Sequence, residues 1–195
     1  MADIVKRLLR KNIQLSYKLV GLLDRSANHG DSLYRSKLKQ VLLSQKENLR
    51  NKNILDVGSG SWTWTKDTFS PVCKITTFDV TPHANVDIVG DLYHVSALFL
   101  PSSFDAVIAT DVFEHLANPV KALQQLHRVL KPHGLLIAST PFKKNLHGEE
   151  YGDYWRITRQ GWQYLLEQAG FENSEISWLG EELFPMAYFV QAGKR

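Results

Sequence analysis

From residue 53 onward, short apolar runs alternate with helical patterns along the chain. The runs are apolar enough to be buried on both faces, which is typical of strands in a parallel sheet that helices cover. The expected strands are residues 53–57, 74–80, 86–91, 104–112 and 135–140, with two more around 175–179 and 187–192. Strands that alternate with helices predict a doubly wound α/β fold.

Two helices of this region have clear start and stop signals. Asn118 can cap the first helix, Pro119 suits its first turn, and "KPHG" at 131–134 stops it. The inner stripe of this helix is Val120, Leu123, Leu126 and Leu130. A later helix follows Thr158, and Gly170 is its expected C-terminal cap.

The N-terminal region has a different pattern. Apolar residues spaced three, four and seven apart mark one helix face, and they are Ile4, Leu8, Leu15, Leu19 and Leu22. The polar stretch 24–32 breaks this helix, and residues 33–48 predict a second one. We therefore expect residues 1–50 to form an N-terminal helical extension or cap, and residues 51–195 to form the α/β domain.

Composition limits the class of protein. The chain has 195 residues, of which 44% are hydrophobic, so it can bury a core as one domain. It contains no apolar run long enough to span a membrane and no signal-peptide pattern, so we expect a cytoplasmic protein. A single cysteine, Cys73, excludes a disulfide framework and a cysteine-rich zinc site.

Charge is distributed unevenly along the chain. Residues 1–53 contain 12 Lys and Arg against 4 Asp and Glu, a balance of +8. The remainder contains 11 against 16, a balance of −5, and the two add up to the net charge of +3. A basic end on an acidic body can contact nucleic acid or an anionic membrane surface, and the alternative is a solvated helix face.

The stretch "NILDVGSGSWTW" at 53–64 is typical of a strand that opens into a ligand-binding turn. Gly58 and Gly60 allow the backbone to approach a ligand closely, although a tight turn without ligand gives the same pattern. A dinucleotide site needs a third glycine, and that position holds Thr63. Asp56 also lies within the turn and disfavours a pyrophosphate. The loop therefore suits a cationic or zwitterionic ligand.

Two further acids follow expected strands. Asp79 ends the second strand, 23 residues after Asp56, where a carboxylate can bind both hydroxyls of a ribose. Asp91 ends the third strand and could accept a hydrogen bond from an exocyclic adenine amine beside Leu92. The alternative for both acids is an ordinary polar strand end.

These motifs together resemble a known family. "ILDVGSG", "TFDV", "VGDL", "SFDAVIATDVFEHLANPVKALQQLHRVLKPHGLLIASTPF" and "DYWRITRQGWQYLLEQAGF" look like the successive motifs of class I S-adenosylmethionine-dependent methyltransferases. The resemblance is closest to the bacterial group with an Asp-Tyr-Trp-Arg-x-Thr segment, and it covers roughly residues 50 to 171 in the family's order. It implies a Rossmann-like, mostly parallel seven-stranded sheet whose last strand is antiparallel.

The resemblance also implies the cofactor and its contacts. The cofactor is S-adenosylmethionine, with S-adenosylhomocysteine as the product. The implied contacts are Asp56, Gly58 and Gly60 at the methionine portion, Asp79 with the adjoining Val80 at the ribose, Asp91 with Leu92 at the adenine, and Thr110 with Asp111 beside the methionine end. Trp62 and His133 depart from the family pattern. Trp62 either closes over the cofactor or packs the next helix, and His133 is expected in a surface turn.

The segment "DVFEHL" places Asp111, Glu114 and His115 just past the fourth strand, on the expected methyl side of the cofactor. His115 is the candidate general base, because an unperturbed histidine titrates near neutral pH. The alternative is that Glu114 and His115 order the loop or cap a helix.

A long polar and aromatic segment, residues 142–158, follows the fifth expected strand. The residues of this segment expected to line a lid over the methyl acceptor are His147, Tyr154, Trp155 and Arg156. Arg156 could pair with a carboxylate or phosphate of the substrate. The alternative is that Trp155 packs in the core and Arg156 pairs with Asp153 or Glu150.

We expect no metal site, because the remaining histidines, His29, His83, His94 and His127, lack metal-ligand spacing. The expected function is methyl transfer to an oxygen or nitrogen of a small metabolite, lipid precursor or glycan. Nucleic acid is not expected, because no RNA- or DNA-binding module is visible. The basic N-terminal helix leaves peripheral membrane contact open. The alternatives are a non-catalytic methyltransferase-fold protein that binds a ligand or partner, and a disfavoured nicotinamide oxidoreductase.

Overall fold

The computed structural model describes residues 27–148 and 150–195. The expected helix over the first 23 residues, its basic face and its membrane contact lie outside the described residues. The chain divides into two compact units, Met1–Lys37 and Leu38–Arg195, and helix α2 (Ala27–Ser44) crosses the division. None of the helices that the structure describes is long and apolar enough to cross a membrane.

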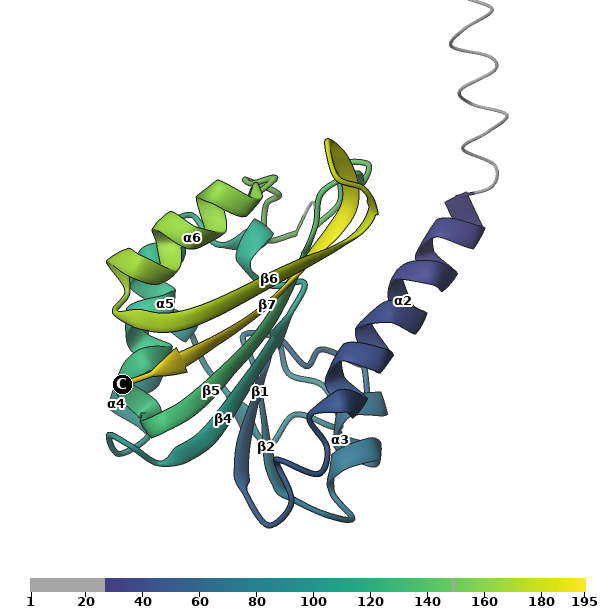
Figure 1. Cartoon of the computed structure of the whole chain (residues 1–195). Helices are drawn as coiled ribbons and strands as arrows, with labels where there is room; N and C mark the ends of the chain where they lie inside the picture. The colour runs from purple at the N-terminus through teal and green to yellow at the C-terminus, as the bar shows by residue number, and fades with distance from the viewer. Residues whose placement is uncertain (1–26, 149) are drawn as a thin grey trace, which may run out of the picture. The chain divides into compact units, whose positions relative to one another are not determined.

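The second unit contains one seven-stranded sheet (Figure 1). Its strands are β1 (Asn53–Val57), β2 (Lys74–Asp79), β3 (Ile88–Val89), β4 (Phe104–Thr110), β5 (Leu130–Pro141), β6 (Phe171–Glu181) and β7 (Phe184–Lys194). The order across the sheet is β3-β2-β1-β4-β5-β7-β6, and β7 is antiparallel to both of its neighbours. The predicted seven-stranded, mostly parallel α/β sheet with an antiparallel last strand is therefore confirmed.

The helices and 3-10 turns of this unit are α3 (Trp64–Phe69), η1 (Leu92–His94), α4 (Val95–Leu98), η2 (Phe113–His115), α5 (Pro119–Val129) and α6 (Arg159–Gln168). The predicted caps are present. The side chain of Asn118 accepts a hydrogen bond from the backbone N–H of Lys121 at 3.0 Å, and Thr158 accepts one from Gly161 at 3.0 Å. Gly170 follows the end of α6 with a φ of 85°.

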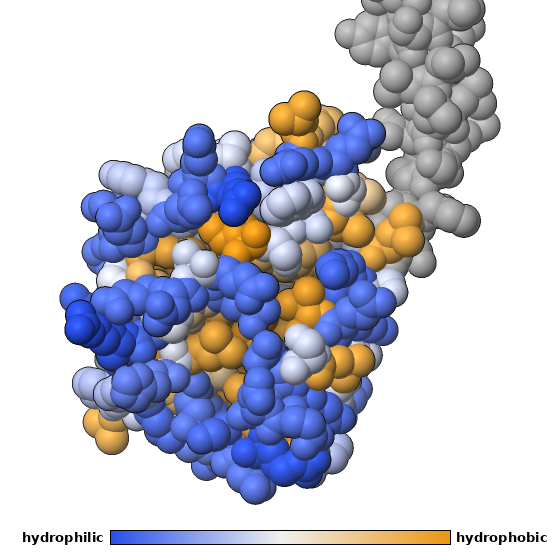
Figure 2. Space-filling view, in the orientation of Figure 1, coloured by the Kyte–Doolittle hydropathy of each residue, from blue (hydrophilic) through white to orange (hydrophobic). Residues whose placement is uncertain are grey.

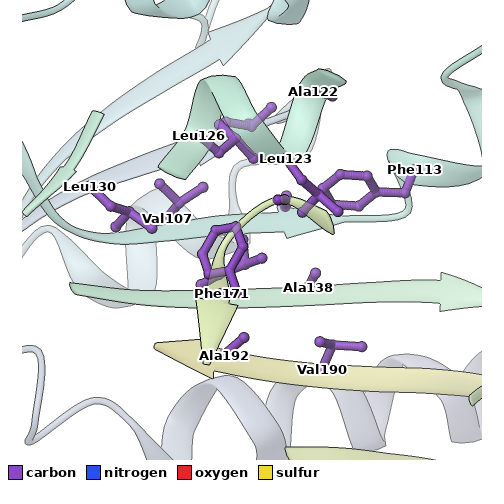
Figure 3. Packing of buried hydrophobic residues seen from close by; sticks show 14 of the residues in the cluster. Val107, Phe113, Ala122, Leu123, Leu126, Leu130, Ala138, Phe171, Val190 and Ala192 are labelled. Atoms are coloured by element: carbon purple, nitrogen blue, oxygen red, sulfur yellow. The ribbon is translucent and has the colours of Figure 1, made fainter. Parts of the chain in front are cut away.

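Alternate residues of the central strands point to opposite faces of the sheet, and both faces are buried. Leu55 and Val107 belong to one buried cluster, whereas Ile54 and Ile108 belong to another. Figure 1 shows α4, α5 and α6 over one face of the sheet, and Figure 3 shows Val107 of the first cluster beneath Leu123 and Leu126 of α5. Burial of both faces explains why these strands are apolar at successive positions. The central strands therefore end in a rigid edge that can support a site.

The second cluster extends N-terminally beyond the predicted domain start at residue 51. Leu42 and Leu49 are buried in it together with Phe69, and Leu38 and Val41 pack against it. Because these residues cover the second face of the sheet, the compact unit begins at Leu38.

Strand β5 also begins earlier than predicted. It starts at Leu130, directly after α5, so "KPHG" lies inside the strand and its pairing with β4 is irregular there. His133 is exposed and has a φ of 61°, a left-handed conformation that favours glycine. His133 therefore lies on the surface, as expected, but in an irregular part of a strand.

Candidate functional site

A cavity of about 520 Å³ lies at the carboxyl ends of β1, β2 and β4. The chain order of the strands reverses between β1 and β4, and ligands of open α/β sheets bind at such a switch point. The cavity is lined by Val57, Gly58, Gly60, Phe78, Asp79, Val80, Thr81, His83, Gly90, Asp91, Leu92, Asp111, Val112, His115, Leu116, Glu150 and Tyr151. Its volume is typical of a site for a small molecule or cofactor.

The turn after β1 is built around Gly58. Its φ is +70°, and a Cβ atom at this position would lie 2.3 Å from Cγ2 of Val112. The N–H of Gly58 donates to the carbonyl of Phe78 at 2.9 Å, which holds the turn against the end of β2. A side chain at residue 58 would therefore both strain the backbone and collide with the wall of the cavity.

Asp79 joins two loops at the cavity. One of its carboxylate oxygens accepts a hydrogen bond from the N–H of Gly60 at 2.8 Å, and the other accepts from the N–H of Thr81 at 2.8 Å. A carboxylate that accepts backbone N–H bonds on both oxygens is held in one orientation. Asp79 therefore presents a fixed negative group to the cavity.

Asp56 lies beneath the turn rather than among the lining residues. It is 3% exposed, and its Oδ2 atom has no hydrogen-bond partner among the described residues. Burial, together with the negative charge of Asp79, raises the pKa of Asp56 from 3.8 to about 8, and the Lys66 ammonium partly opposes this shift. A buried oxygen without a donor, beside a second carboxylate, favours a cationic ligand.

The other predicted cofactor contacts divide into two groups. Val80, Asp91 and Leu92 line the cavity, and Asp91 also caps η1 by accepting from the N–H of Tyr93 at 2.8 Å. Asp111 lines the cavity with a φ of 56°, which is uncommon for a residue other than glycine. Thr110 ends β4 but is not among the lining residues.

The second side of the cavity is formed by η2 and part of the segment 142–158. Glu114 is fully buried, and neither of its carboxylate oxygens has a hydrogen-bond partner among the described residues. Its Oε1 atom lies 3.7 Å from Nε2 of His115 and 3.8 Å from Nε2 of His147. His115 lines the cavity, and its ring contacts that of His147 with centroids 4.8 Å apart.

The segment 142–158 is clamped by an ion pair. The Arg156 guanidinium donates to both oxygens of Asp153, at 2.5 and 2.8 Å, and also to the carbonyl of Lys144 at 3.2 Å. This guanidinium holds the pKa of Asp153 well below its usual range. Of the two alternatives for Arg156, the structure contains the internal pair with Asp153, and Arg156 does not line the cavity.

The remaining predicted substrate residues lie at the outer part of this segment. Tyr154 and Trp155 are exposed, and their N–H groups donate to the backbone carbonyl of Glu114 at 2.7 and 3.3 Å. The indole N–H of Trp155 donates to the carbonyl of Leu116 at 2.7 Å. Trp155 is therefore not a core residue. None of His147, Tyr154 and Trp155 is among the lining residues.

Several lining residues were not identified from the sequence. Those with polar side chains are Thr81 and His83 after β2, and Glu150 and Tyr151 in the segment 142–158. His83 is exposed and is one of the lining residues. The position of Thr81 and His83 just beyond a strand end is a signal that could have identified them, whereas Glu150 and Tyr151 come from a long loop without such a signal.

Trp62 does not line the cavity. It is 38% exposed, and the Lys39 ammonium lies 5.8 Å from the centroid of its ring and 5.0 Å from that of Trp64. Trp62 thus lies at the surface beside α2 and α3 and does not close over the cavity.

Comparisons with known proteins agree with this geometry. A family profile described as "Methyltransferase domain" matches residues 27–176. A tRNA U34 carboxymethyltransferase of Campylobacter curvus is 28% identical over 170 residues, which are 75% of this chain and 57% of that protein. A thiol S-methyltransferase of Rattus norvegicus is 26% identical over 172 residues, or 72% of this chain and 70% of that protein.

Solved structures show the same fold. The chain resembles a Burkholderia thailandensis 1,6-didemethyltoxoflavin-N1-methyltransferase, described as holding its substrate and S-adenosylhomocysteine, with a TM-score of 0.67 and 16% identity. The match covers 87% of this chain and 84% of that structure.

One expectation is wrong. We expected no nucleic-acid partner, but the Campylobacter curvus relative is by its name an enzyme of tRNA. The expectation depended on the lack of a recognisable RNA-binding module in this sequence. The similarity to an enzyme of tRNA shows that this lack does not exclude a nucleic-acid partner. The predicted class is confirmed at the level of the family: this chain has the fold of S-adenosylmethionine-dependent methyltransferases and belongs to the methyltransferase domain family.

Proposed function

We propose that this protein transfers a methyl group from S-adenosylmethionine to an oxygen or nitrogen of a small metabolite, lipid precursor or glycan. The observation that carries the proposal is the turn after β1, where one oxygen of the buried Asp56 has no donor among the described residues and the turn borders a cavity of suitable volume. A zwitterionic ligand with an ammonium group would supply that donor. The same turn lacks the third glycine that a pyrophosphate needs.

The residues around the cavity fit S-adenosylmethionine in three parts. Asp56 and the turn at Gly58 and Gly60 would hold the methionine portion, because the turn is open at Gly60, where a Cβ atom would meet only the Asp79 carboxylate at 4.0 Å. Asp79 with Val80 would bind the ribose, and Asp91 with Leu92 would bind the adenine. Asp111 would lie beside the methionine end, and Thr110 would support it from the end of β4.

When bound, the cofactor supplies a methyl group on a sulfonium, and an in-line attack by the acceptor transfers it and leaves a neutral thioether. The protein's task is to align the acceptor and to receive a proton if the acceptor must lose one. His115 is placed for this task, because its Nδ1 atom lies 2.5 Å from the carbonyl of Gly152. A carbonyl only accepts, so Nδ1 carries the proton and Nε2 is free to take one.

The acceptor would approach over the segment 142–158. Glu150 and Tyr151 of this segment line the cavity, and the exposed Tyr154 and Trp155 follow a few residues later in the same segment. We infer that aromatic and carboxylate groups here contact the acceptor, and that His147 and Arg156 act by shaping the segment. The named relatives act on tRNA and on thiols, so a larger or softer acceptor is a possible outcome of the test.

Ligand-induced thermal stabilisation tests the cofactor. We expect S-adenosylhomocysteine to raise the melting temperature and NAD to leave it unchanged. Equal shifts with both ligands, or none with S-adenosylhomocysteine, would contradict the proposal.

The acceptor needs a second experiment. The protein is incubated with an extract of its source organism and S-adenosylmethionine labelled in the methyl group, and the fraction that gains label is identified with and without ribonuclease. Label in a small-molecule, lipid or glycan fraction supports the proposal, and label that ribonuclease removes contradicts the proposed acceptor. A protein that binds S-adenosylhomocysteine but labels nothing would favour the alternative, a non-catalytic ligand- or partner-binding protein.

A further inference from the structure

Glu114, His115 and His147, here called the Glu114 cluster, bring together three groups that can bind a metal ion. One ligand atom from each residue lies within 4.8 Å of the others. Both imidazole Nε2 atoms face the same carboxylate oxygen, Oε1 of Glu114, at 3.7 and 3.8 Å. These separations are longer than a hydrogen bond, so neither imidazole donates directly to the carboxylate.

The other ring nitrogen of each histidine is engaged by an acceptor. Nδ1 of His115 lies 2.5 Å from the carbonyl of Gly152. Nδ1 of His147 lies 3.2 Å from the carbonyl of Asn145 and 3.3 Å from Oδ2 of Asp153. Since carbonyls and carboxylates accept, both Nδ1 atoms carry a proton, and both neutral imidazoles turn an Nε2 lone pair towards Glu114.

Two lone pairs and a buried carboxylate repel one another unless a cation lies among them. Glu114 has no hydrogen-bond donor of its own among the described residues, and burying an unpaired carboxylate is costly. Ligand atoms about 2.0–2.2 Å from a tetrahedral zinc ion are about 3.4 Å apart. The two separations from Oε1 of Glu114 exceed this value by a few tenths of an ångström, and the ligand atoms of the three residues all lie within 4.8 Å of one another, so binding an ion requires the two imidazoles to move closer together.

We propose that Glu114, His115 and His147 bind one divalent transition-metal ion, for which Zn²⁺ is the reference probe. Two imidazoles and one carboxylate suit zinc and similar first-row ions, whereas Mg²⁺ and Ca²⁺ prefer oxygen ligands. The acceptors behind the histidines have the arrangement that supports ligands in known metal sites, including a carboxylate behind His147. The expectation of no metal site was based on sequence spacing, and spacing cannot show that residue 147 meets residues 114 and 115.

The site has access to solvent and to the cavity. The side chain of His147 is 32% exposed, so an ion can enter from the surface. His115 also lines the cavity, and three protein ligands leave a coordination position for another molecule. Gly148 permits this packing, because a Cβ atom there would lie 2.7 Å from the His115 ring.

A role in the reaction follows only if the proposed methyl transfer is correct. A hydroxyl group of the acceptor bound to the ion would have a lowered pKa and would lose its proton to water more readily. The ionised oxygen would form a bond to the methyl carbon as the carbon–sulfur bond breaks, and the sulfur would leave as the thioether of S-adenosylhomocysteine. When the ion is bound, His115 is a metal ligand and not the general base, because both roles use its Nε2 atom.

A proton is the rival cation. Protonation of His147 would also place a positive charge beside Glu114, and the Glu114 and Asp153 carboxylates raise the pKa of His147. The proton-only arrangement needs no metal and gives no metal affinity. Measuring the affinity for an added ion therefore separates the two.

The test uses the full chain without a histidine tag, stripped with a chelator and titrated with Zn²⁺ by calorimetry and with Co²⁺ by absorption spectroscopy. We expect one ion per chain, visible d–d bands from Co²⁺, and no heat with Mg²⁺. His147→Ala and Glu114→Gln should each weaken Zn²⁺ binding by roughly a hundredfold or more, and Asp153→Asn by about tenfold. The control His133→Gly removes an exposed histidine outside the cluster and should leave binding unchanged.

Binding that is equally strong in His147→Ala and in the wild-type protein would overturn the proposal, as would a wild-type protein that binds no Zn²⁺. Glu114 is buried, so its substitution can prevent folding. If Glu114→Gln fails to fold, the result from His147→Ala, at a partly exposed residue, decides the test. S-adenosylhomocysteine is titrated in parallel. Metal binding without S-adenosylhomocysteine binding would contradict the proposed function alone, and the reverse result would contradict the metal site alone.

Discussion

Behind each of the two sides of the cavity lies a buried carboxyl group with at least one oxygen that has no hydrogen-bond partner among the described residues, but the two sides are built differently. On the β1–β2 side, Asp56 lies beneath a turn that backbone N–H groups hold in place, and the negative charge of the cavity residue Asp79 acts on it. On the η2 side, Glu114 faces two histidines, its sequence neighbour His115 and His147, which the clamped segment brings to it. For Asp56, a ligand ammonium can supply the missing donor. For Glu114, the titratable partners His115 and His147 come from the chain itself.

The two sides differ because strand ends shape the first side, whereas a long segment shapes the second. The β1–β2 side depends on adjacent parallel strands and needs few side chains to keep its shape. The η2 side depends on the Asp153–Arg156 pair and on contacts of residues 154 and 155 with the Glu114 carbonyl. We therefore expect substitutions on the two sides to alter different properties.

The largest expected effect is on the β1–β2 side. Asp79→Ala removes the carboxylate that accepts from Gly60 and Thr81, and with it the proposed ribose contact. Affinity for S-adenosylhomocysteine, measured by calorimetry, should fall about a hundredfold, since charge-assisted hydrogen bonds contribute about 1.5–3 kcal/mol each. Asp67→Asn, which neutralises an exposed acid on α3, is the control. A similar loss in both variants would mean that the effect is one of net charge.

Arg156→Ala is the corresponding change on the η2 side. It leaves the Asp153 carboxylate, whose side chain is 6% exposed, without its guanidinium, so the urea midpoint should fall by the equivalent of about 2 kcal/mol. Affinity for S-adenosylhomocysteine should change less than threefold. Arg128→Ala, at an exposed arginine on α5, controls for loss of a cation. If Arg156→Ala abolished cofactor binding instead, the two sides would not be independent.

The pH dependence of cofactor binding should follow Asp56. Its pKa is raised from 3.8 in the unfolded chain to about 8, so its contribution to folding stability is fully present below pH 3.8 and is lost as the pH rises through 8. A ligand ammonium favours the ionised form. Affinity for S-adenosylhomocysteine should therefore rise up to tenfold per pH unit below 8 and level off above it.

Asp56→Asn is the matched variant for this slope. Its affinity should be weaker at pH 8 and nearly independent of pH between 6 and 8. A wild-type protein with the same flat profile would show that Asp56 does not respond to the ligand.

The smallest expected effect lies outside both sides. His133→Gly relieves a left-handed backbone conformation and should raise the free energy of unfolding by about 0.5–1 kcal/mol. Asn51→Gly, at a φ of 61°, is the control, because asparagine tolerates this conformation and less is gained. Affinity for S-adenosylhomocysteine should be unchanged in both variants. These values are the reference against which the affinity changes of the cavity variants are judged.

The sheet could be predicted from the sequence because burial on both faces makes each strand a continuous apolar run. Asp79 and Asp91 could be placed at the cavity once the strands were known, because each acid follows a strand and the carboxyl ends of parallel strands meet at one edge of the sheet. Arg156 could not be assigned, because its guanidinium has an acid three residues away and an open cavity as competing partners. The meeting of His147 with Glu114 depends on the path of a long loop, and no local pattern encodes that path.

The place of β7 in the sheet has a consequence for biosynthesis. It is the last of the seven strands to leave the ribosome, yet it lies between β5 and β6. Until it emerges, β5 has an unpaired edge and β6 has no neighbour in the sheet. The nascent chain therefore exposes the open edge of β5 until β7 has been made, and an open strand edge is a place where another chain can pair.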